Sequence, residues 1–278
     1  LPWTGLSNGG VGVGARPPNG PIISAMQLTS EGLARAARAY ASDGFVKLEP
    51  LFDAARMQAI DDELARYVSD IAPVIPPADI VFEKQPNPDG SRAIRNLWRM
   101  ENHSQYFRDL ALDANLLELM RRLVGGEPLL CGVELFAKPA RVGSAVPFHQ
   151  DNAYFNLVPD DALTCWVALD DTSIENGCVY YAKGSHRGPL LAHKASGVQG
   201  NSLMLDGVPA VGTFEEVPGV IARGSAIIHH CSLLHRSEPN RSNRSRRGLM
   251  IVYRGAHCAV DPERARAYRK VLSQLTQA

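Results

Sequence analysis

The strongest constraint on the fold of this sequence is a change of pattern near residue 128. Before that point, apolar residues recur at the spacing of amphipathic helices, whereas after it short β-type runs alternate with turn residues. The 24 glycines and 19 prolines suit many short strands better than a helical bundle. We therefore expect a mainly β fold, a sandwich or barrel, buttressed by N-terminal helices.

Four segments carry helix signals. In the first, Thr29 and Ser30 can cap the N-terminus, and the dipeptide Asp43-Gly44 ends the apolar periodicity. The last begins with a capping residue, Asp261, followed by Pro262 in the first turn. The predicted helices span residues 29–43, 52–68, 104–124 and 261–275.

Short runs rich in β-branched and aromatic residues predict the strands. No linker divides the chain, so we expect residues 29–278 to form a single domain. The glycine- and proline-rich residues 1–28 are expected to be irregular. The predicted strands span residues 45–48, 129–138, 145–151, 163–169, 178–182, 212–217, 225–230 and 248–254.

The charge balance excludes partners that need a strongly charged protein. Lysine and arginine together number 29, as do aspartate and glutamate, so no net charge steers the chain to nucleic acid or to an anionic membrane. No stretch approaches the ~18 consecutive apolar residues of a membrane span. The five cysteines form no Cys-x-x-Cys pair and are expected to be buried thiols. We expect a cytoplasmic protein that acts on a small molecule, with an oligomeric state that the sequence leaves open.

One short segment places a histidine and a carboxylate on the same side of a strand. Because strand side chains alternate with period two, His149 and Asp151 in Val146-Pro-Phe-His-Gln-Asp share a face. Such a pair is either a hydrogen-bonded couple on a sheet or half of a metal site. A second histidine would complete the two-histidine, one-carboxylate set that holds Fe(II) and leaves coordination positions open.

A distal segment offers three candidates for that second histidine. They are His229, His230 and His235, and a basic run follows them. The basic run is either a solvated face, a phosphate patch, or the source of an inward-pointing arginine. Alternation sends Arg246 and Arg247 to opposite faces, so one of them can clamp a carboxylate with its planar pair of donors.

The sequence resembles the phytanoyl-CoA dioxygenase family of Fe(II)/2-oxoglutarate-dependent oxygenases. Four blocks in the right order carry the resemblance: Phe148-His-Gln-Asp-Asn, residues 164–179 around Glu-Asn-Gly-Cys, Gly184-Ser-His, and residues 234–247 from Leu-His-Arg-Ser to Arg-Arg. The likeness covers roughly residues 30–255 and is strongest after residue 128. It implies a double-stranded β-helix, a cupin-like jelly roll with the metal between its sheets.

The resemblance also assigns residues to roles. It implies that His149, Asp151 and His235 bind the iron, because His235 is the histidine followed by serine two positions on and by arginine eleven positions on. For the cosubstrate, the implied contacts are Arg246 as the clamp of the distal carboxylate, Ser237 beside it, Trp166 lining the pocket and, by a looser match, Asn96. His186 belongs to a turn motif and is expected to be structural.

The activity that the resemblance implies is hydroxylation, or another oxidation, of a small organic molecule by O2 and 2-oxoglutarate, with release of succinate and CO2. The carboxylate at Asp151 distinguishes the chain from related halogenases, which have a small residue there. Two alternatives are a cupin-like metalloenzyme that does not use 2-oxoglutarate and a non-catalytic jelly roll that binds a small ligand. Residues expected to line the substrate pocket are Asn152, Tyr154, Phe155 and Trp98.

Two loops are expected to act as lids over the pocket. They are residues 79–98 and 190–212, whose candidate polar contacts are Lys84, Arg95, His193 and Lys194. Tyr154 and Phe155 could equally be ordinary core residues.

Overall fold

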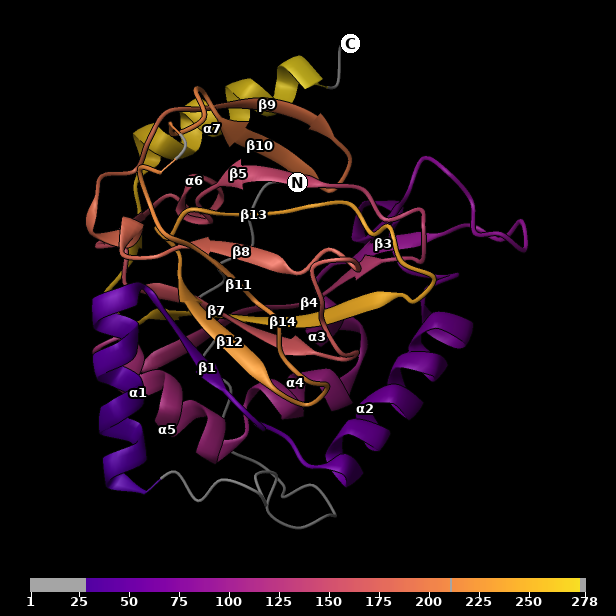
Figure 1. The fold of residues 1–278 in the computed structure, drawn as a ribbon, viewed down its shortest axis with the longest axis horizontal. Helices are drawn as coiled ribbons and strands as arrows, with labels where there is room; N and C mark the ends of the chain where they lie inside the picture. Colours follow the sequence, from indigo (N-terminus) through magenta and orange to yellow (C-terminus); the bar gives the residue numbers. More distant parts are fainter. Residues whose placement is uncertain (1–28, 211, 276–278) are drawn as a thin grey trace.

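Two antiparallel sheets that face each other form the body of the protein. The computed structural model describes residues 29–210 and 212–275, so the expectation for residues 1–28 lies outside the described residues. In spatial order the larger sheet contains β1 (Phe45–Leu48), β12 (Ala226–His230), β7 (Ala162–Ala168), β14 (Arg246–Gly255), β4 (Pro128–Lys138), β3 (Ile94–Leu97) and β2 (Ile80–Phe82) (Figure 1).

The smaller sheet has four strands. Their order is β11 (Glu216–Pro218), β8 (Val179–Ala182), β13 (His235–Ser237) and β5 (Val146–His149). From β4 to β14 the chain passes repeatedly between the two sheets, which is the topology of a double-stranded β-helix. The predicted fold class, a jelly roll with N-terminal helices, is confirmed.

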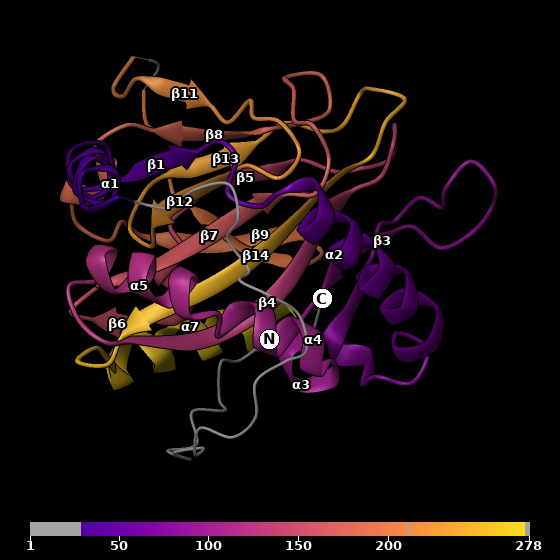
Figure 2. The ribbon, with the colours of Figure 1, turned by 90° about the horizontal axis from the view of Figure 1, so that it is seen from below.

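The two faces of the larger sheet differ in chemistry because side chains alternate along its strands. One face presents buried apolar residues such as Val133, Val167, Ile228, Leu249 and Ile251. Apolar stripes of the helices cover this face, and Figure 2 shows α4 and α5 on the side of the sheet away from β8. The opposite face is turned toward the smaller sheet and is available for a site.

The helices are α1 (Ser30–Asp43), α2 (Ala54–Arg66), α3 (Met100–His103), α4 (Gln105–Ala111), α5 (Ala114–Leu123), α6 (Asn152–Phe155) and α7 (Pro262–Leu275). The expectation of one continuous helix over residues 104–124 was wrong. Asp113 interrupts it, because its carboxylate accepts hydrogen bonds from the backbone N–H groups of Asn115 (3.0 Å) and Leu116 (3.2 Å) and so caps a new helix, α5.

The two segments expected to be lid loops contain strands instead. Residues 79–98 form β2 and β3, which extend the larger sheet beside β4. Residues 190–212 contain a hairpin of β9 (His193–Val198) and β10 (Asn201–Leu205). Elsewhere, β15 (Ala259–Val260) and β6 (Leu157–Val158) form another two-stranded sheet. Polar residues within β3, β9 and β10 hid the β pattern, and β2 is only three residues long. Within the described ranges no helix is both long and apolar enough to cross a membrane.

Candidate active site

The register of the larger sheet gathers polar side chains on the face opposite the helices. Directly paired residues of antiparallel strands point to the same side. His229 of β12 pairs with Thr164 of β7, while Arg246 of β14 pairs with Lys138 of β4. Asn96 of β3 pairs with Phe136. All of these lie on the inner face, which therefore carries both donors and charges.

The smaller sheet contributes two histidines to the same interior. His235 of β13 pairs with His149 of β5 on one side and with Tyr181 of β8 on the other. The imidazole centroids of His149 and His235 lie 4.1 Å apart. A one-residue slip of β13 would turn His235 to the outer face, so strand register fixes this pair.

Asp151, which follows β5, completes a compact ligand set. Its Oδ1 atom lies 3.6 Å from Nε2 of His149 and 3.5 Å from Nε2 of His235. One ligand atom from each residue falls within 4.8 Å of the others, and both imidazoles are buried. Two imidazole nitrogens and a carboxylate oxygen that converge in this way are the donors that suit Fe(II) in a facial triad.

Backbone carbonyls fix the tautomers of the two histidines. Nδ1 of His149 lies 2.9 Å from the carbonyl oxygen of Pro147, and Nδ1 of His235 lies 2.9 Å from that of Leu233. Because a carbonyl only accepts, each Nδ1 carries the proton, and each Nε2 lone pair points at the centre of the set. The residues present therefore fit a divalent metal ion.

The electrostatics of the set favour the same protonation states. Burial, followed by the neighbouring His149, lowers the pKa of His235 to about 3, and burial is also the main cause of the lowered pKa of His149. Burial alone would raise the pKa of Asp151, but His235, His229 and His149 outweigh it and hold that pKa below its ordinary value. Neutral imidazoles and an ionised carboxylate are what metal binding requires.

Two further side chains hold the outer oxygen of Asp151. Thr164 donates its hydroxyl to Oδ2 at 2.9 Å, and Nε2 of His229 lies 3.2 Å from the same oxygen. His229 thus supports the carboxylate from behind. His230 lies elsewhere, because its Nδ1 accepts from the backbone N–H of Ser232 at 3.0 Å. Of the three candidate histidines in the described chain, only His235 groups with His149 and Asp151, whereas His230 groups with Asp160 and Cys231.

The two adjacent arginines of β14 have different surroundings, as alternation predicts. Arg246 is 2% exposed, donates from Nε (3.2 Å) and Nη2 (2.8 Å) to the carbonyl of Gly177, and lies 5.2 Å from the ring centroid of Trp166. Arg247 pairs with Asp170 at 2.7 Å. Only Arg246 therefore faces the interior.

The Arg246 guanidinium keeps a donor for a ligand. Among the described residues, no acceptor binds its Nη1. Ser237 of β13 is also buried in the interior. Lys138 is also buried, and burial, followed by Arg246 and Arg95, lowers its pKa well below the ordinary value. A carboxylate arriving here would meet the Arg246 guanidinium in a region of low dielectric.

Gly248 and Trp166 shape the space between Arg246 and the metal ligands. A Cβ atom on Gly248 would lie 2.2 Å from the Trp166 indole, so the indole packs directly against the β14 backbone. A glycine is required at this position because any side chain would displace the indole.

Asn96 lies farther along the same face. It is completely buried, and neither its Oδ1 nor its Nδ2 has a hydrogen-bond partner among the described residues. A Cβ on Gly200, in the turn between β9 and β10, would lie 2.0 Å from Asn96 Oδ1. The hairpin turn therefore closes over Asn96.

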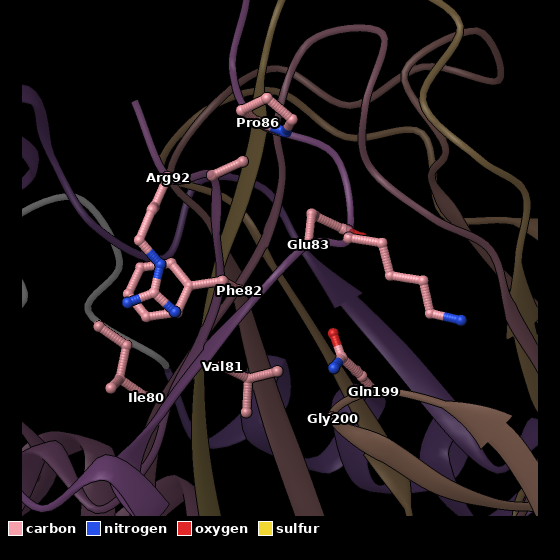
Figure 3. Close-up of a pocket in the computed structure, with 10 residues that line it drawn as sticks. Ile80, Val81, Phe82, Glu83, Pro86, Arg92, Gln199 and Gly200 are labelled. Carbon is pink, nitrogen blue, oxygen red and sulfur yellow. The ribbon is translucent and has the colours of Figure 1, made fainter. Parts of the chain in front are cut away.

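A groove opens next to this turn. Its volume is about 670 Å³, and it lies between the β2–β3 edge and the hairpin turn, with Gln199 and Gly200 facing Val81, Phe82 and Glu83 (Figure 3). The two segments expected to be lids thus meet here. Lys84 lines the groove, whereas Arg95 bonds Glu83 at 2.8 Å.

The other expected lid contacts lie on β9. Nε2 of His193 accepts from the backbone N–H of Gln150 at 3.1 Å. Lys194 forms an exposed ion pair with Asp206 at 3.0 Å.

The four residues expected to line the substrate pocket lie in different surroundings. The side chain of Asn152 closes a turn, because its Nδ2 donates to the Leu157 carbonyl and its Oδ1 accepts from the Leu157 backbone N–H. Tyr154 packs edge-on against His149 with 5.9 Å between centroids and bonds Leu203 through its hydroxyl. Phe155 packs in a small apolar cluster. Trp98 meets Phe136 edge-on at 5.2 Å and has a buried Nε1 atom without a partner in the described chain.

Sequence reasoning missed Thr164, Lys138, Tyr181 and Glu134. All four lie on interior positions of strands that also carry a predicted site residue or pair with one. The signal that could have found Thr164 is period-two spacing from Trp166; the others need the strand pairing, which the sequence does not specify.

Comparisons with known proteins agree with this site. The sequence model of the phytanoyl-CoA dioxygenase (PhyH) family matches residues 40–248 of this chain. A probable alpha-ketoglutarate-dependent hypophosphite dioxygenase of Stutzerimonas stutzeri is 30% identical over 232 residues, which cover 79% of this chain and 77% of that protein. Human peroxisomal phytanoyl-CoA dioxygenase is 25% identical over 231 residues, covering 79% of this chain and 67% of its own.

Solved structures share the fold. EctD from S. alaskensis with bound Fe has a TM-score of 0.67 and 26% identity, covering 86% of this chain and 83% of that one. The epimerase SnoN in complex with Fe3+, alpha ketoglutarate and nogalamycin RO has a TM-score of 0.68 and 22% identity, and the match covers 84% of this chain and 88% of SnoN. The family match, the 30% identical relative and the interior of the jelly roll lead to one conclusion. The chain belongs to the phytanoyl-CoA dioxygenase family and is an Fe(II)/2-oxoglutarate-dependent oxygenase.

Proposed function

We propose that His149, Asp151 and His235 bind the ferrous ion through which the chain hydroxylates, or otherwise oxidises, a small organic molecule. The observation that carries this assignment is the convergence of Nε2, Oδ1 and Nε2 inside the barrel, with both Nδ1 atoms bonded to carbonyls. When bound, the iron supplies O2 activation coupled to conversion of 2-oxoglutarate to succinate and CO2.

We further propose that the far carboxylate of 2-oxoglutarate binds Arg246 and Ser237, with Trp166 as one wall and Asn96 beside it. Arg246 is held in place by the Gly177 carbonyl, so its orientation is set before the ligand arrives. The Lys138 amine lies in the same region, although burial disfavours its charged form. The buried Arg246 guanidinium favours a ligand with a carboxylate over the alternative of a metalloenzyme without 2-oxoglutarate.

The remaining contributions of the chain are orientation and exclusion of water. Thr164 and His229 hold Asp151 so that Oδ1 points at the histidines. The apolar surroundings, including Trp166, Ile227 and Leu233, keep bulk water from the centre. Neutral imidazoles at His149 and His235 are ready to coordinate without losing a proton.

Anaerobic addition of Fe(II) and 2-oxoglutarate to the apoprotein tests this function. The expected result is a visible charge-transfer band that needs both additions, followed by succinate formation when O2 and substrate are supplied. Metal binding with no 2-oxoglutarate band would favour a metalloenzyme of another kind. Metal retention without succinate for any substrate would favour a ligand-binding jelly roll.

Three broader expectations are also proposals. We propose that the chain from residue 29 on is one domain, supported by the pairing of N-terminal β1 with β12 in the larger sheet. We propose a cytoplasmic location, which fractionation of source cells would test. We propose that the protein binds neither nucleic acid nor membranes, as its balanced charge predicts.

A further inference from the structure

Glu134 is a buried carboxyl on the inner face of the larger sheet that the proposed mechanism does not use. Its β14 partner is Met250, and the β7 partner of Met250 is Trp166. Glu134 thus lies in the same cross-strand row as the proposed cosubstrate wall. It is 9% exposed.

Glu134 differs from other buried acidic side chains, which have partners in the part of the chain that the structure describes. Glu83 pairs with Arg95 and accepts from the Ser144 backbone, while Asp79 pairs with Arg99 and His103. Within residues 29–210 and 212–275, no hydrogen bond or ion pair to the Glu134 carboxyl is formed. An ionised carboxyl buried without a partner is costly, so Glu134 is either protonated or paired with a cation that a ligand supplies.

The surroundings of Glu134 favour a positively charged ligand. Burial, followed by the carboxylates of Glu101 and Asp151, raises the pKa of Glu134 to about 8. These carboxylates add negative potential around Glu134. The arginine that acts on Glu134, Arg99, is already engaged with Asp79.

Two aromatic rings lie beside the carboxyl. Phe136 is two residues along β4 and therefore on the same face. Trp98 directly follows β3, whose register pairs Leu97 with Leu135, so the next position lies opposite Glu134. A carboxylate next to aromatic rings is a common binding site for an organic cation.

We propose that Glu134 binds the protonated amine of the substrate, which makes small organic ammonium compounds the substrate class. This inference rests on the proposed function, because it concerns the same interior. Glu134 sets specificity: its carboxylate pairs with the ammonium group, Phe136 and Trp98 pack against the neighbouring carbons, and the rest of the substrate extends toward His149, Asp151 and His235. An anionic compound would be repelled.

Calorimetric titration of the protein, loaded anaerobically with Fe(II) and 2-oxoglutarate, tests the inference. The probes are hexylammonium, 1-hexanol and hexanoate, which share one carbon chain and differ in charge. Wild-type protein is expected to bind hexylammonium at least about ten-fold more tightly than 1-hexanol, and hexanoate most weakly. In Glu134→Gln the preference for hexylammonium over 1-hexanol should fall to within about two-fold.

Two further variants keep the test decisive. Glu127→Gln removes an exposed carboxylate just before β4 and should leave the preference unchanged. Glu134→Asp keeps the charge and should retain part of the preference, so it serves if Glu134→Gln does not fold. A preference that survives in folded Glu134→Gln, or its absence in wild type, overturns the inference.

The 2-oxoglutarate charge-transfer band separates this inference from the proposed function. If wild type forms the band but does not prefer hexylammonium, the function stands and the role of Glu134 is refuted. If wild type forms no band, the proposed function fails, and with it the inference. A band in both wild type and Glu134→Gln, with the preference lost only in the variant, supports both.

Discussion

Nε2 of His235 lies 3.5 Å from Oδ1 of Asp151, although the two residues belong to widely separated parts of the chain. The contact exists because β13 pairs with β5, which sets His235 opposite His149. The metal-binding set is therefore a consequence of strand register, with Asp151 added by the turn after β5. Predictions about the site follow from the groups that hold these strands and side chains in place.

Replacing Arg246 by alanine should weaken 2-oxoglutarate binding by about 2–5 kcal/mol, because a buried charge-assisted contact is lost. Titration of the charge-transfer band with 2-oxoglutarate measures the change. Arg247→Ala is the matched control, since Arg247 pairs with Asp170 and Asp61 outside the interior. An unchanged dissociation constant in Arg246→Ala would contradict its role as the clamp and point to another buried group, such as Lys138.

Thr164 and His229 act as positioning residues through Asp151. Thr164→Val keeps the shape of the side chain but removes the hydrogen bond to Oδ2, and His229→Phe removes the second one. Each change should weaken Fe(II) binding by about 10–100-fold. Equilibrium Fe(II) titration measures this without turnover, and wild-type affinity in both variants would contradict the positioning role.

Gly248→Ala should reduce 2-oxoglutarate affinity while leaving Fe(II) affinity near that of wild type. The added Cβ would collide with the Trp166 indole and push it into the proposed cosubstrate space. Separate titrations with Fe(II) and with 2-oxoglutarate distinguish the two sites. Equal losses of both affinities would mean that the substitution disturbs the whole sheet.

His230 should make the stability of the apoprotein sensitive to acid. Burial is the main cause that lowers its pKa to about 4, below the ordinary value of about 6.5 in the unfolded chain. Between these values the unfolded state binds more protons, so the free energy of unfolding should fall as pH falls from about 6.5 to about 4, by on the order of 2 kcal/mol.

Urea denaturation at several pH values checks this prediction. His230→Gln should flatten the pH dependence in that window and leave Fe(II) binding largely intact, because His230 lies outside the ligand set. A steep pH dependence that persists in the variant would assign it to other groups, and loss of Fe(II) binding would mean that His230 is a ligand.

The sequence pointed to the residues of the candidate site but not to the strands at the edges of the fold. The expected strand over residues 145–151 was too long: β5 ends at His149, and Asp151 meets that histidine from the helical turn that follows, so alternation was the wrong reason for the pair. Strand alternation did separate Arg246 from Arg247, because neighbouring residues of β14 point to opposite faces. Choosing His235 over His229 and His230 required the family resemblance, since all three lie within one short segment.

What the sequence missed depends on contacts between distant segments. The strands β3, β9 and β10 contain polar residues that conceal their pattern, β2 has only three residues, and the pairing of these strands decides their structure. Lys138 and Glu134 became visible as interior residues only when β14 and β4 were aligned. Asp113 broke a helix because its cap competes locally with helix continuation.

Anaerobic Fe(II) titration of wild type and of His149→Ala, Asp151→Ala and His235→Ala tests the proposed centre most directly. We predict one ferrous ion per wild-type chain and loss of that site in each variant, with secondary structure retained. Full Fe(II) binding in any one of the three folded variants would contradict the assignment of that residue as a ligand.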